Sequence, residues 1–443
     1  MTTTTRQVPR LALFPRDAGI NTAGHLTIGA CDTYDLAKEF GTPLYVFDEA
    51  MLRHQCREFV KRFGGRYPDA AVCYASKAFL TRAMAKLVME EGLGLDVVSI
   101  GEFAIAHSVD FPPERVYFHG NNKGPEELAQ ALDWGIGRIV VDSMHELKLL
   151  NEIARERNIS QDILLRLTPN VDPHTHEFTT TGVLDSKFGI PVSTGQAEEA
   201  VVQAMRLGSV NLLGLHFHLG SPIPETAPFE AALRIVLEFA REMKRKYDFD
   251  MVELNIGGGF PVAYTLEDNP PPIAVYSDAI VSTMSNLLLE QSMLPPRLTV
   301  EPGRAIVAQA GVALYTVGVI KEIPGVRKFV CVDGGMSDNI RPPLYGAKYE
   351  ALVANKAGEQ DVHTVTIAGK LCESSDVLVK DIQLARIAPG DVIAVPVCGA
   401  YCVPMSSNYN AMPRPAIVFV NRGNARVVRR RETNEDLYGL DEL

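Results

Sequence analysis

Eight short β-branched or apolar runs, alternating with segments of helical periodicity, constrain the fold more than any other feature. In chain order the runs are Ala70–Ser76, Leu93–Ser99, Arg115–Gly120, Arg138–Ser143, Asp162–Pro169, Val210–Gly220, Met251–Gly259 and Arg297–Arg304. Continuous apolar strands that alternate with helices indicate a parallel sheet covered on both faces. Eight units over about 235 residues fit an α/β protein with a closed (β/α)8 TIM-type barrel. We prefer the barrel to a doubly wound open sheet because the pattern stops at eight.

The rhythm changes after Arg304. Glycine, proline and short alternating runs dominate there, the runs being Ala313–Glu322, Lys328–Asp333, His363–Ala368, Asp391–Val397 and Ala416–Asn421. This pattern predicts a second, β-rich domain of the Greek-key or sandwich-like kind. We therefore expect an N-terminal segment (1–45) that joins the β domain, a barrel (46–310) and a C-terminal β domain (311–443).

Composition and charge narrow the partners. The net charge of −11 argues against a nucleic-acid or anionic-membrane partner, since both need a basic surface. The seven cysteines include no CxxC pair, which is typical of a reduced protein. The N-terminus lacks the apolar core of a signal peptide, and there is no apolar run of about 18 residues. We expect a cytoplasmic protein that acts on a small molecule.

Polar residues and glycines gather at the ends of the eight runs, where the chemistry of a (β/α)8 barrel is located. They are Lys77, Asp96, His119, Arg166, His216, His218, Ser221, Gly257, Gly258, Gly259, Glu301, Gly303 and Arg304. One such ending would mean little, but this many indicate a single crowded site.

Several of these residues also have a non-functional interpretation. Most lysines are solvated surface groups, but a partly desolvated lysine at a barrel mouth can form an imine. His218 could be a core histidine, although its place beside Gly-Ser at a strand end favours a ring that stacks on a cofactor. We interpret His216 as structural. The HxH pair suggests a metal site, but no carboxylate or cysteine stands at the customary spacing, so we predict no metal.

The remaining strand ends suit a phosphorylated, ring-containing cofactor. Gly257–Gly259 could be only a tight turn, yet its backbone N–H groups, with the Ser221 hydroxyl, suit a phosphate. Glu301 could belong to a surface ion pair. In a cofactor pocket its carboxylate can keep a pyridine nitrogen protonated, which makes the ring an electron sink. Arg304 can bind a phosphate or a substrate carboxylate.

The β-rich part carries further polar clusters, at Asp333–Gly346, Cys372–Asp376 and Gly399–Tyr401. Turns explain their glycines but not Arg341, Cys372 and Glu373. A carboxylate next to Cys372 disfavours a thiolate nucleophile, so a neutral thiol that donates a proton fits better.

Taken together, these motifs resemble those of the fold-type III pyridoxal-phosphate (PLP) decarboxylases. The matching strings are YASKA, GLDVVSIGE, HGNNK, DPHTHEFTTTGVLDSKFGI, GLHFHLGS, NIGGGFP, EPGR, VDGGMSDNIRPPLYG, LCESSD and GAYCVPMSSNYN. They span about Tyr74 to Asn410 in a single order. The CES, IRPxLY and MSSNYN strings favour the branch that acts on diaminopimelate.

The resemblance implies pyridoxal 5'-phosphate as cofactor and a role for each residue. Lys77 resembles the Schiff-base lysine, His218 the stacking ring, Glu301 the partner of the pyridine nitrogen and Cys372 the proton donor. The implied cofactor-binding residues are Lys77, Asp96, Arg166, His218, Ser221, Gly257, Gly258, Gly259, Glu301, Gly303, Arg304 and Tyr401. The implied substrate-binding residues are Arg304, Arg341, Tyr345, Glu373 and Tyr401. A head-to-tail homodimer is also implied, with Cys372 and Glu373 serving the partner's site.

The implied reaction is the decarboxylation of meso-2,6-diaminopimelate to L-lysine and CO2, with Arg341 binding a distal carboxylate. Within the family, a decarboxylase of ornithine, arginine, a D-amino acid or a carrier-tethered amino acid is the alternative. An amino-acid racemase on the same barrel is disfavoured by Glu301, because racemases suit a weaker electron sink. A non-catalytic PLP-binding protein would have little use for Arg341 or Cys372.

Overall fold

The computed structural model describes residues 8–172 and 180–443. Residues 173–179, which carry part of the DPHTHEFTTTGVLDSKFGI string, lie outside the described residues. The chain forms two compact units. The described residues of the barrel unit are 56–172, 180–261 and 270–303, and those of the β-rich unit are 8–55, 262–269 and 304–443.

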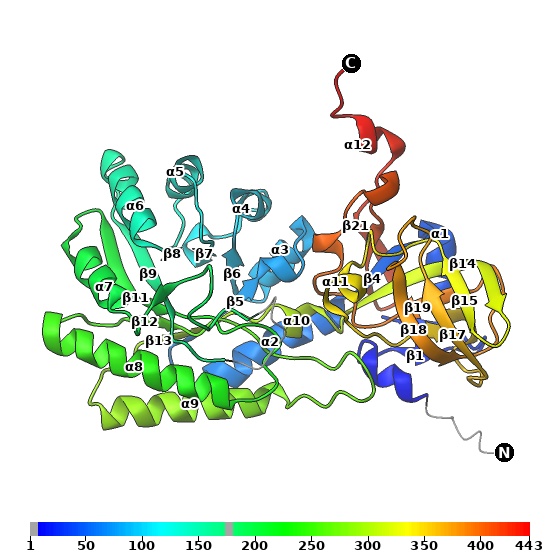
Figure 1. Ribbon diagram of the computed structural model, residues 1–443, viewed down its shortest axis with the longest axis horizontal. Coiled ribbons are helices and arrows are strands. Elements are labelled where there is room, and N and C mark those ends of the chain that lie inside the picture. Colours follow the sequence, from blue (N-terminus) through cyan, green and yellow to red (C-terminus); the bar gives the residue numbers. More distant parts are fainter. Residues whose placement is uncertain (1–7, 173–179) are drawn as a thin grey trace. The chain divides into compact units, whose positions relative to one another are not determined.

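The barrel unit contains the predicted parallel barrel, and each of the eight runs contains one of its strands (Figure 1). The strands are β5 (Ala70–Ala75), β6 (Gly94–Val97), β7 (Val116–Phe118), β8 (Arg138–Val141), β9 (Gln161–Thr168), β11 (Val210–His216), β12 (Glu253–Asn255) and β13 (Arg297–Val300). They pair in parallel in this order, and the sheet closes because β13 also pairs with β5. The short β10 (Ile190–Pro191) adds to β9. The open-sheet alternative is thereby excluded.

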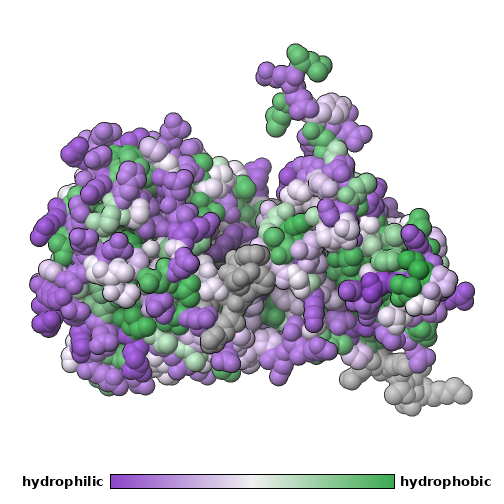
Figure 2. All heavy atoms as spheres, in the orientation of Figure 1, coloured by the Kyte–Doolittle hydropathy of each residue, from purple (hydrophilic) through white to green (hydrophobic). Residues whose placement is uncertain are grey.

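Helices follow the strands and cover the outside of the barrel (Figure 1). They are α3 (Arg82–Glu90), α4 (Ile100–His107), α5 (Pro125–Asp133), α6 (Met144–Glu156), α7 (Gln196–Arg206), α8 (Ala227–Tyr247) and α9 (Ile273–Glu290). Thr81, Ser99 and Ser143 cap three of the N-termini by accepting backbone N–H bonds. Largely hydrophilic side chains cover the outer faces of the helices (Figure 2). No helix of the described residues is long and apolar enough to cross a membrane.

A polar network lies at the amino ends of the barrel strands. The buried carboxylate of Glu253 accepts hydrogen bonds from Tyr117 Oη (2.6 Å), Thr299 Oγ1 (3.1 Å) and Arg138 Nε (3.2 Å). Because all these partners are protein groups, we assign Glu253 a role in stabilising the fold. The active site of such barrels lies at the opposite end, where the strands have their carboxyl ends.

The β-rich unit is built around the long strand β14 (Gly311–Ile323). Its first half pairs with β4 (Leu44–Asp48) and β19 (Val392–Val395), and its second half pairs with β15 (Arg327–Val332). The sheet is completed by β16 (Leu352–Val353), β17 (His363–Ala368), β18 (Val377–Leu384), β20 (Ala416–Asn421) and β21 (Asn424–Arg429). Short helices are α10 (Arg304–Val307), α11 (Arg341–Tyr345) and α12 (Asn434–Tyr438).

The N-terminal part of the chain belongs to the β-rich unit. Strands β1 (Gly19–Ile20), β2 (Leu26–Ile28) and β3 (Cys31–Asp32) form a small sheet, followed by α1 (Thr33–Phe40). β4 then enters the large sheet between β14 and β20, and α2 (Glu49–Gly64) continues into the barrel unit. The observed division therefore differs from the expected boundaries at 45 and 310, because β4 takes its backbone partners from the β-rich sheet.

Candidate functional site

Glu301 is the centre of the polar cluster at the carboxyl ends of the barrel strands. It follows β13 and is 5% exposed. Its carboxylate oxygens lie 2.8 Å from His119 Nε2 and 3.3 Å from His216 Nε2. Asn255 Nδ2 donates to Oε1 at 2.7 Å. Four different strand ends thus supply one buried anion and its three partners, so the barrel brings together residues far apart in the sequence.

The protonation of the cluster follows from this geometry. Burial raises the pKa of Glu301, but the two histidines lower it more, so it stays well below its usual range. Burial lowers the pKa of His119, yet Asp96 and Glu301 raise it overall. Burial lowers the pKa of His216 to about 3, which leaves this ring neutral. The cluster therefore presents an ionised carboxylate beside a histidine whose pKa is raised.

The same three side chains offer a set of ligands for a metal ion, since their ligand atoms lie within 4.8 Å of one another. The carboxylate missing beside the HxH pair in the sequence is thus supplied by Glu301. However, His119 Nε2 and Glu301 Oε1 already form an ion pair with each other at 2.8 Å. A metal ion would have to displace this ion pair, and the expectation of no metal stays a prediction.

Asp96 and Arg166 extend the cluster. Asp96 Oδ1 lies 3.8 Å from His119 Nε2, and its pKa is raised because the carboxyl is buried. Arg166 Nε lies 3.8 Å from Asp142 Oδ1, and its guanidinium lies over the ring of Phe188 at 4.5 Å. The side chains of all these charged residues, Asp96, His119, Asp142 and Arg166, are buried. The strand ends therefore carry buried charges of both signs.

His218 contacts the glycine triplet. Its Nδ1 accepts a hydrogen bond from the N–H of Gly258 at 3.1 Å, so a neutral ring carries its proton on Nε2. Burial holds its pKa well below the usual range, with Lys77 and Arg166 adding to the effect. A Cβ on Gly258 would lie 2.1 Å from the carbonyl oxygen of Glu301, which explains why only glycine fits there.

Close packing therefore explains part of the requirement for glycine in Gly257–Gly259. The N–H of Gly257 donates to Asn255 Oδ1 at 2.9 Å, and that of Gly258 is used by His218. The expected phosphate contacts of Gly257 and Gly258 stay predictions. They require each N–H group to leave its present acceptor, or to share its hydrogen between that acceptor and the phosphate. Gly259, with φ +118°, is the third member.

Lys77 lies on a helical turn, Ser76–Ala78, directly after β5. Its side chain is exposed in the single chain. The Glu301-Pro302-Gly303 turn packs beside it: Ala75 N donates to Pro302 O at 3.1 Å. A Cβ on Gly303 would lie 3.0 Å from Ala78 Cβ. The lysine turn and the glutamate turn are thus fixed to each other.

A second cluster lies within the β-rich unit and combines two buried arginines with three tyrosines. Arg304 Nη1 donates to Tyr264 Oη at 2.7 Å, and its guanidinium lies 4.9 Å from the ring centre of Tyr401. Arg341 lies 4.6 Å above the ring of Tyr264 and donates to Tyr349 Oη. We call Arg304, Arg341, Tyr264, Tyr349 and Tyr401 the arginine–tyrosine cluster.

Cys372 and Glu373 lie apart from that cluster, on an exposed loop between β17 and β18. Asn410 Oδ1 accepts a hydrogen bond from Cys372 N at 3.0 Å, and Tyr409 Oη donates to Cys372 O at 3.5 Å. The MSSNYN segment thus holds the backbone of the cysteine. Tyr345, at the end of α11, is half-buried.

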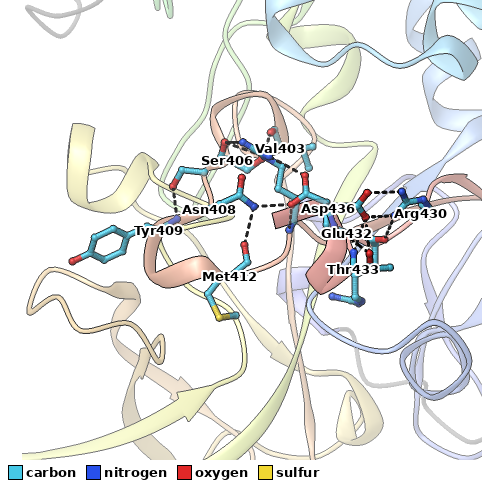
Figure 3. Close-up of polar contacts among 12 residues, drawn as sticks. Val403, Ser406, Asn408, Tyr409, Met412, Arg430, Glu432, Thr433 and Asp436 are labelled. Carbon is cyan, nitrogen blue, oxygen red and sulfur yellow. Dashed lines mark hydrogen bonds and ion pairs between the residues drawn. The ribbon is translucent and has the colours of Figure 1, made fainter. Parts of the chain in front are cut away.

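The MSSNYN segment is in turn anchored to the C-terminal part of the chain. Asn408 Nδ2 donates to Glu432 Oε2 at 2.7 Å and to Met412 O at 3.0 Å, and Arg414 pairs with Glu432 at 2.8 Å. Figure 3 shows the ring of Tyr409 pointing away from this anchor. One end of the segment is therefore fixed while the other reaches the cysteine loop.

Sequence reasoning missed several members of these clusters. It noted His119 at a strand end without a role, and it did not single out Asn255, Tyr264 or Tyr349. The HGNN and LNIGGG strings carried a signal for the first two, since both stand at strand ends. Tyr264 had no such signal, because the segment 262–269 leaves the barrel unit between β12 and α9.

Comparisons with known proteins agree with this architecture. Residues 49–308 match the family model described as the pyridoxal-dependent decarboxylase, pyridoxal binding domain. A diaminopimelate decarboxylase of Bacillus subtilis is 48% identical over 421 residues, covering 95% of this chain and 96% of that protein. One from Bacillus methanolicus is 47% identical over 413 residues, covering 93% and 96%. A crystal structure of the M. jannaschii diaminopimelate decarboxylase with L-lysine has a TM-score of 0.90 at 36% identity, covering 97% and 98%.

Proposed function

Since the chain belongs to the diaminopimelate decarboxylases of the pyridoxal-dependent decarboxylase family, we propose that Lys77 and the Glu301 cluster form its active site. The enzyme converts meso-2,6-diaminopimelate to L-lysine and CO2 with pyridoxal 5'-phosphate as cofactor. The observation that carries the residue assignment is the buried, ionised Glu301 on a turn packed against the Lys77 turn.

The residues present fit the cofactor. A pyridine nitrogen is kept protonated by a nearby carboxylate, and Glu301 is an anion buried among donors. Among the described residues His216 Nδ1 is buried without a hydrogen-bond partner, so the cluster retains unused polar capacity. When bound, pyridoxal phosphate supplies an electron sink for the pair that CO2 leaves behind.

Each barrel residue then has a task. The ε-amino group of Lys77 holds the cofactor, and its exposure gives an incoming amino acid access to it. Glu301 holds a proton at the pyridine nitrogen, while His119 and His216 keep the carboxylate in place. The neutral ring of His218 offers a flat face for stacking. Ser221 and Gly259 offer a hydroxyl and an N–H to the phosphate, with Asp96, Arg166 and Gly303 lining the site.

The proposed substrate-binding residues belong to the β-rich unit. Arg304 and Arg341 carry positive charge at buried positions, which suits a substrate that has two carboxylates. Tyr401, Tyr345 and Glu373 complete the substrate-binding set, and Glu373 suits an amino group. The Cys372 thiol delivers a proton to the carbon that loses CO2.

A homodimer with shared sites accounts for the exposure of Cys372 and Glu373 in the single chain. The hairpin of β14 and β15 exposes the apolar residues Val319, Ile323 and Val326, and hydrophobic surface gathers on the β-rich unit (Figure 2). Exposed apolar surface of this kind marks interaction sites. We also infer a cytoplasmic location, which the seven free cysteines support.

Borohydride reduction of the cofactor-loaded enzyme, followed by peptide mapping, tests the assignment. We expect one reduced adduct, on Lys77, and an adduct on another lysine would overturn it. Turnover measured side by side on meso-diaminopimelate, ornithine, arginine and D-amino acids tests the substrate. Chiral analysis of recovered L-amino acid distinguishes decarboxylation from racemisation.

A further inference from the structure

Tyr264 occupies the centre of the arginine–tyrosine cluster and is not one of the proposed substrate-binding residues. It lies on the segment 262–269, which the β-rich unit contains although its neighbours in sequence belong to the barrel unit. Its hydroxyl accepts the 2.7 Å hydrogen bond from Arg304 Nη1, and its ring faces the guanidinium of Arg341 at 4.6 Å. One side chain thus contacts both arginines, by two different interactions.

The surroundings of Tyr264 fix its orientation. Its ring meets that of Tyr349 edge to face, with the ring centres 5.4 Å apart and an angle of 88° between the planes. The carboxylate of Asp268 accepts the N–H of both Tyr264 and Thr265 at 2.9 Å. Ring and backbone are therefore held independently, so Tyr264 is a rigid support.

The chemistry of this support differs from that of an ion pair. A phenol orients a guanidinium through its oxygen and its ring without cancelling the positive charge. A carboxylate in the same place would neutralise it. Among the described residues, no acid forms an ion pair with the buried Arg341; its partners are Tyr264 and Tyr349. The charge of Arg341 therefore stays available to a carboxylate ligand.

We propose that Tyr264 is a positioning residue that sets Arg304 relative to Arg341 and so selects a substrate with two carboxylates. The inference rests on the proposed substrate-binding roles of the two arginines. Tyr264 acts through the arginines and takes no part in bond breaking. Its loss should therefore raise KM for the dicarboxylate substrate far more than it lowers kcat.

Three variants of the cofactor-loaded enzyme test the proposal in graded steps. Tyr264→Phe removes the hydroxyl but keeps the ring, and we expect KM for meso-diaminopimelate to rise about tenfold with kcat within about threefold of wild type. Tyr264→Leu also removes the ring, and KM should rise by about another fivefold. Asp268→Ala leaves the ring intact but frees its backbone, so KM should rise about threefold.

Tyr247→Phe is the matched control. It also removes a tyrosine hydroxyl that takes part in a short hydrogen bond, in this case one donated to Glu198 at 2.6 Å on the barrel surface. Its KM should match that of the wild type. Thermal unfolding and the absorbance of bound cofactor, measured for each variant, should stay unchanged and show that folding and loading are intact. The exposed Asp268 provides a variant that folds even if Tyr264→Leu does not.

The outcomes separate this inference from the proposed function. If the wild-type enzyme does not turn over meso-diaminopimelate, the proposed function fails. If it does, and Tyr264→Phe and Asp268→Ala keep KM within twofold of wild type, the positioning role alone is overturned. A fall in kcat at unchanged KM would overturn it too, because it would place Tyr264 in the chemical step.

Discussion

At the residue scale, the site depends on how burial changes the charge of side chains. Glu301 stays ionised in the interior only because His119 and His216 oppose the effect of burial on its pKa. The neighbouring rings differ: the pKa of His119 is raised and that of His216 is lowered to about 3. Neighbouring acids thus stabilise the charged form of the His119 ring, while burial keeps the His216 ring neutral.

Replacing Glu301 by Gln should remove the anion while keeping the shape of the side chain. We expect kcat to fall by about 100-fold or more, as when one preorganised electrostatic contact is removed from an active site. The measurement is kcat at saturating substrate, with bound cofactor quantified by absorbance. Glu253→Gln, at the other end of the barrel, is the control and should keep kcat near wild type if it folds. A fully active Glu301→Gln enzyme would contradict the role at the pyridine nitrogen.

The low pKa of His216 predicts a pH dependence of stability. The unfolded chain binds a proton at this residue below about pH 6.5, whereas the folded chain does not until about pH 3. Stability should therefore fall as pH falls through this window, by about 1.4 kcal/mol per pH unit for this residue. Urea unfolding at pH 6.5, 5.5 and 4.5 should show a slope that is smaller by this amount in His216→Gln. An identical slope in the variant would contradict a neutral buried ring.

At the element scale, the structure joins two segments that the sequence shows as separate strings. The MSSNYN segment is fixed to Glu432 at one end and holds the backbone of Cys372 at the other. Asn410 adopts a left-handed conformation, φ +51°, which turns its side chain toward the cysteine loop. The loop that carries the proposed proton donor is thus held from a different element.

Asn410→Ala should loosen this loop. We expect kcat to fall about tenfold while KM for meso-diaminopimelate changes little, because misplacement of a proton donor affects the chemical step. Asn410→Asp keeps an acceptor for Cys372 N–H and should retain most of the activity. Steady-state kinetics of both variants measure the difference. Equal losses in the two would show that the hydrogen bond to Cys372 is not what matters.

At the scale of the whole molecule, we propose an active site that draws on two subunits. Mixing and refolding Lys77→Ala and Cys372→Ala chains in equal amounts tests this. If the sites are shared, half of the dimers are mixed and each has one intact site, so about a quarter of wild-type activity should return. Each variant refolded alone should stay inactive. No recovery in the mixture would mean that Lys77 and Cys372 of one chain serve the same site.

The sequence by itself determined the barrel and most of its strand ends. Apolar runs that alternate with helical segments form a parallel sheet. The polar residues that follow each run therefore meet at one end of the barrel. The strand-end pattern predicts a common site for Asp96, Arg166, His216 and Glu301. The ring of His216, which we interpret as structural, lies against Glu301 in the fold.

Only the tertiary structure decided which of these residues touch and what charge they carry. Contacts such as Glu301 with His119, or Arg304 and Arg341 with Tyr264, join residues at least 40 positions apart in the chain. No local pattern encodes such distances. The pKa shifts depend on burial, which is a property of the packed molecule. Local sequence thus determines which residues form the site. The charges of these residues, and the membership of segment 262–269 in the β-rich unit, arise only on folding.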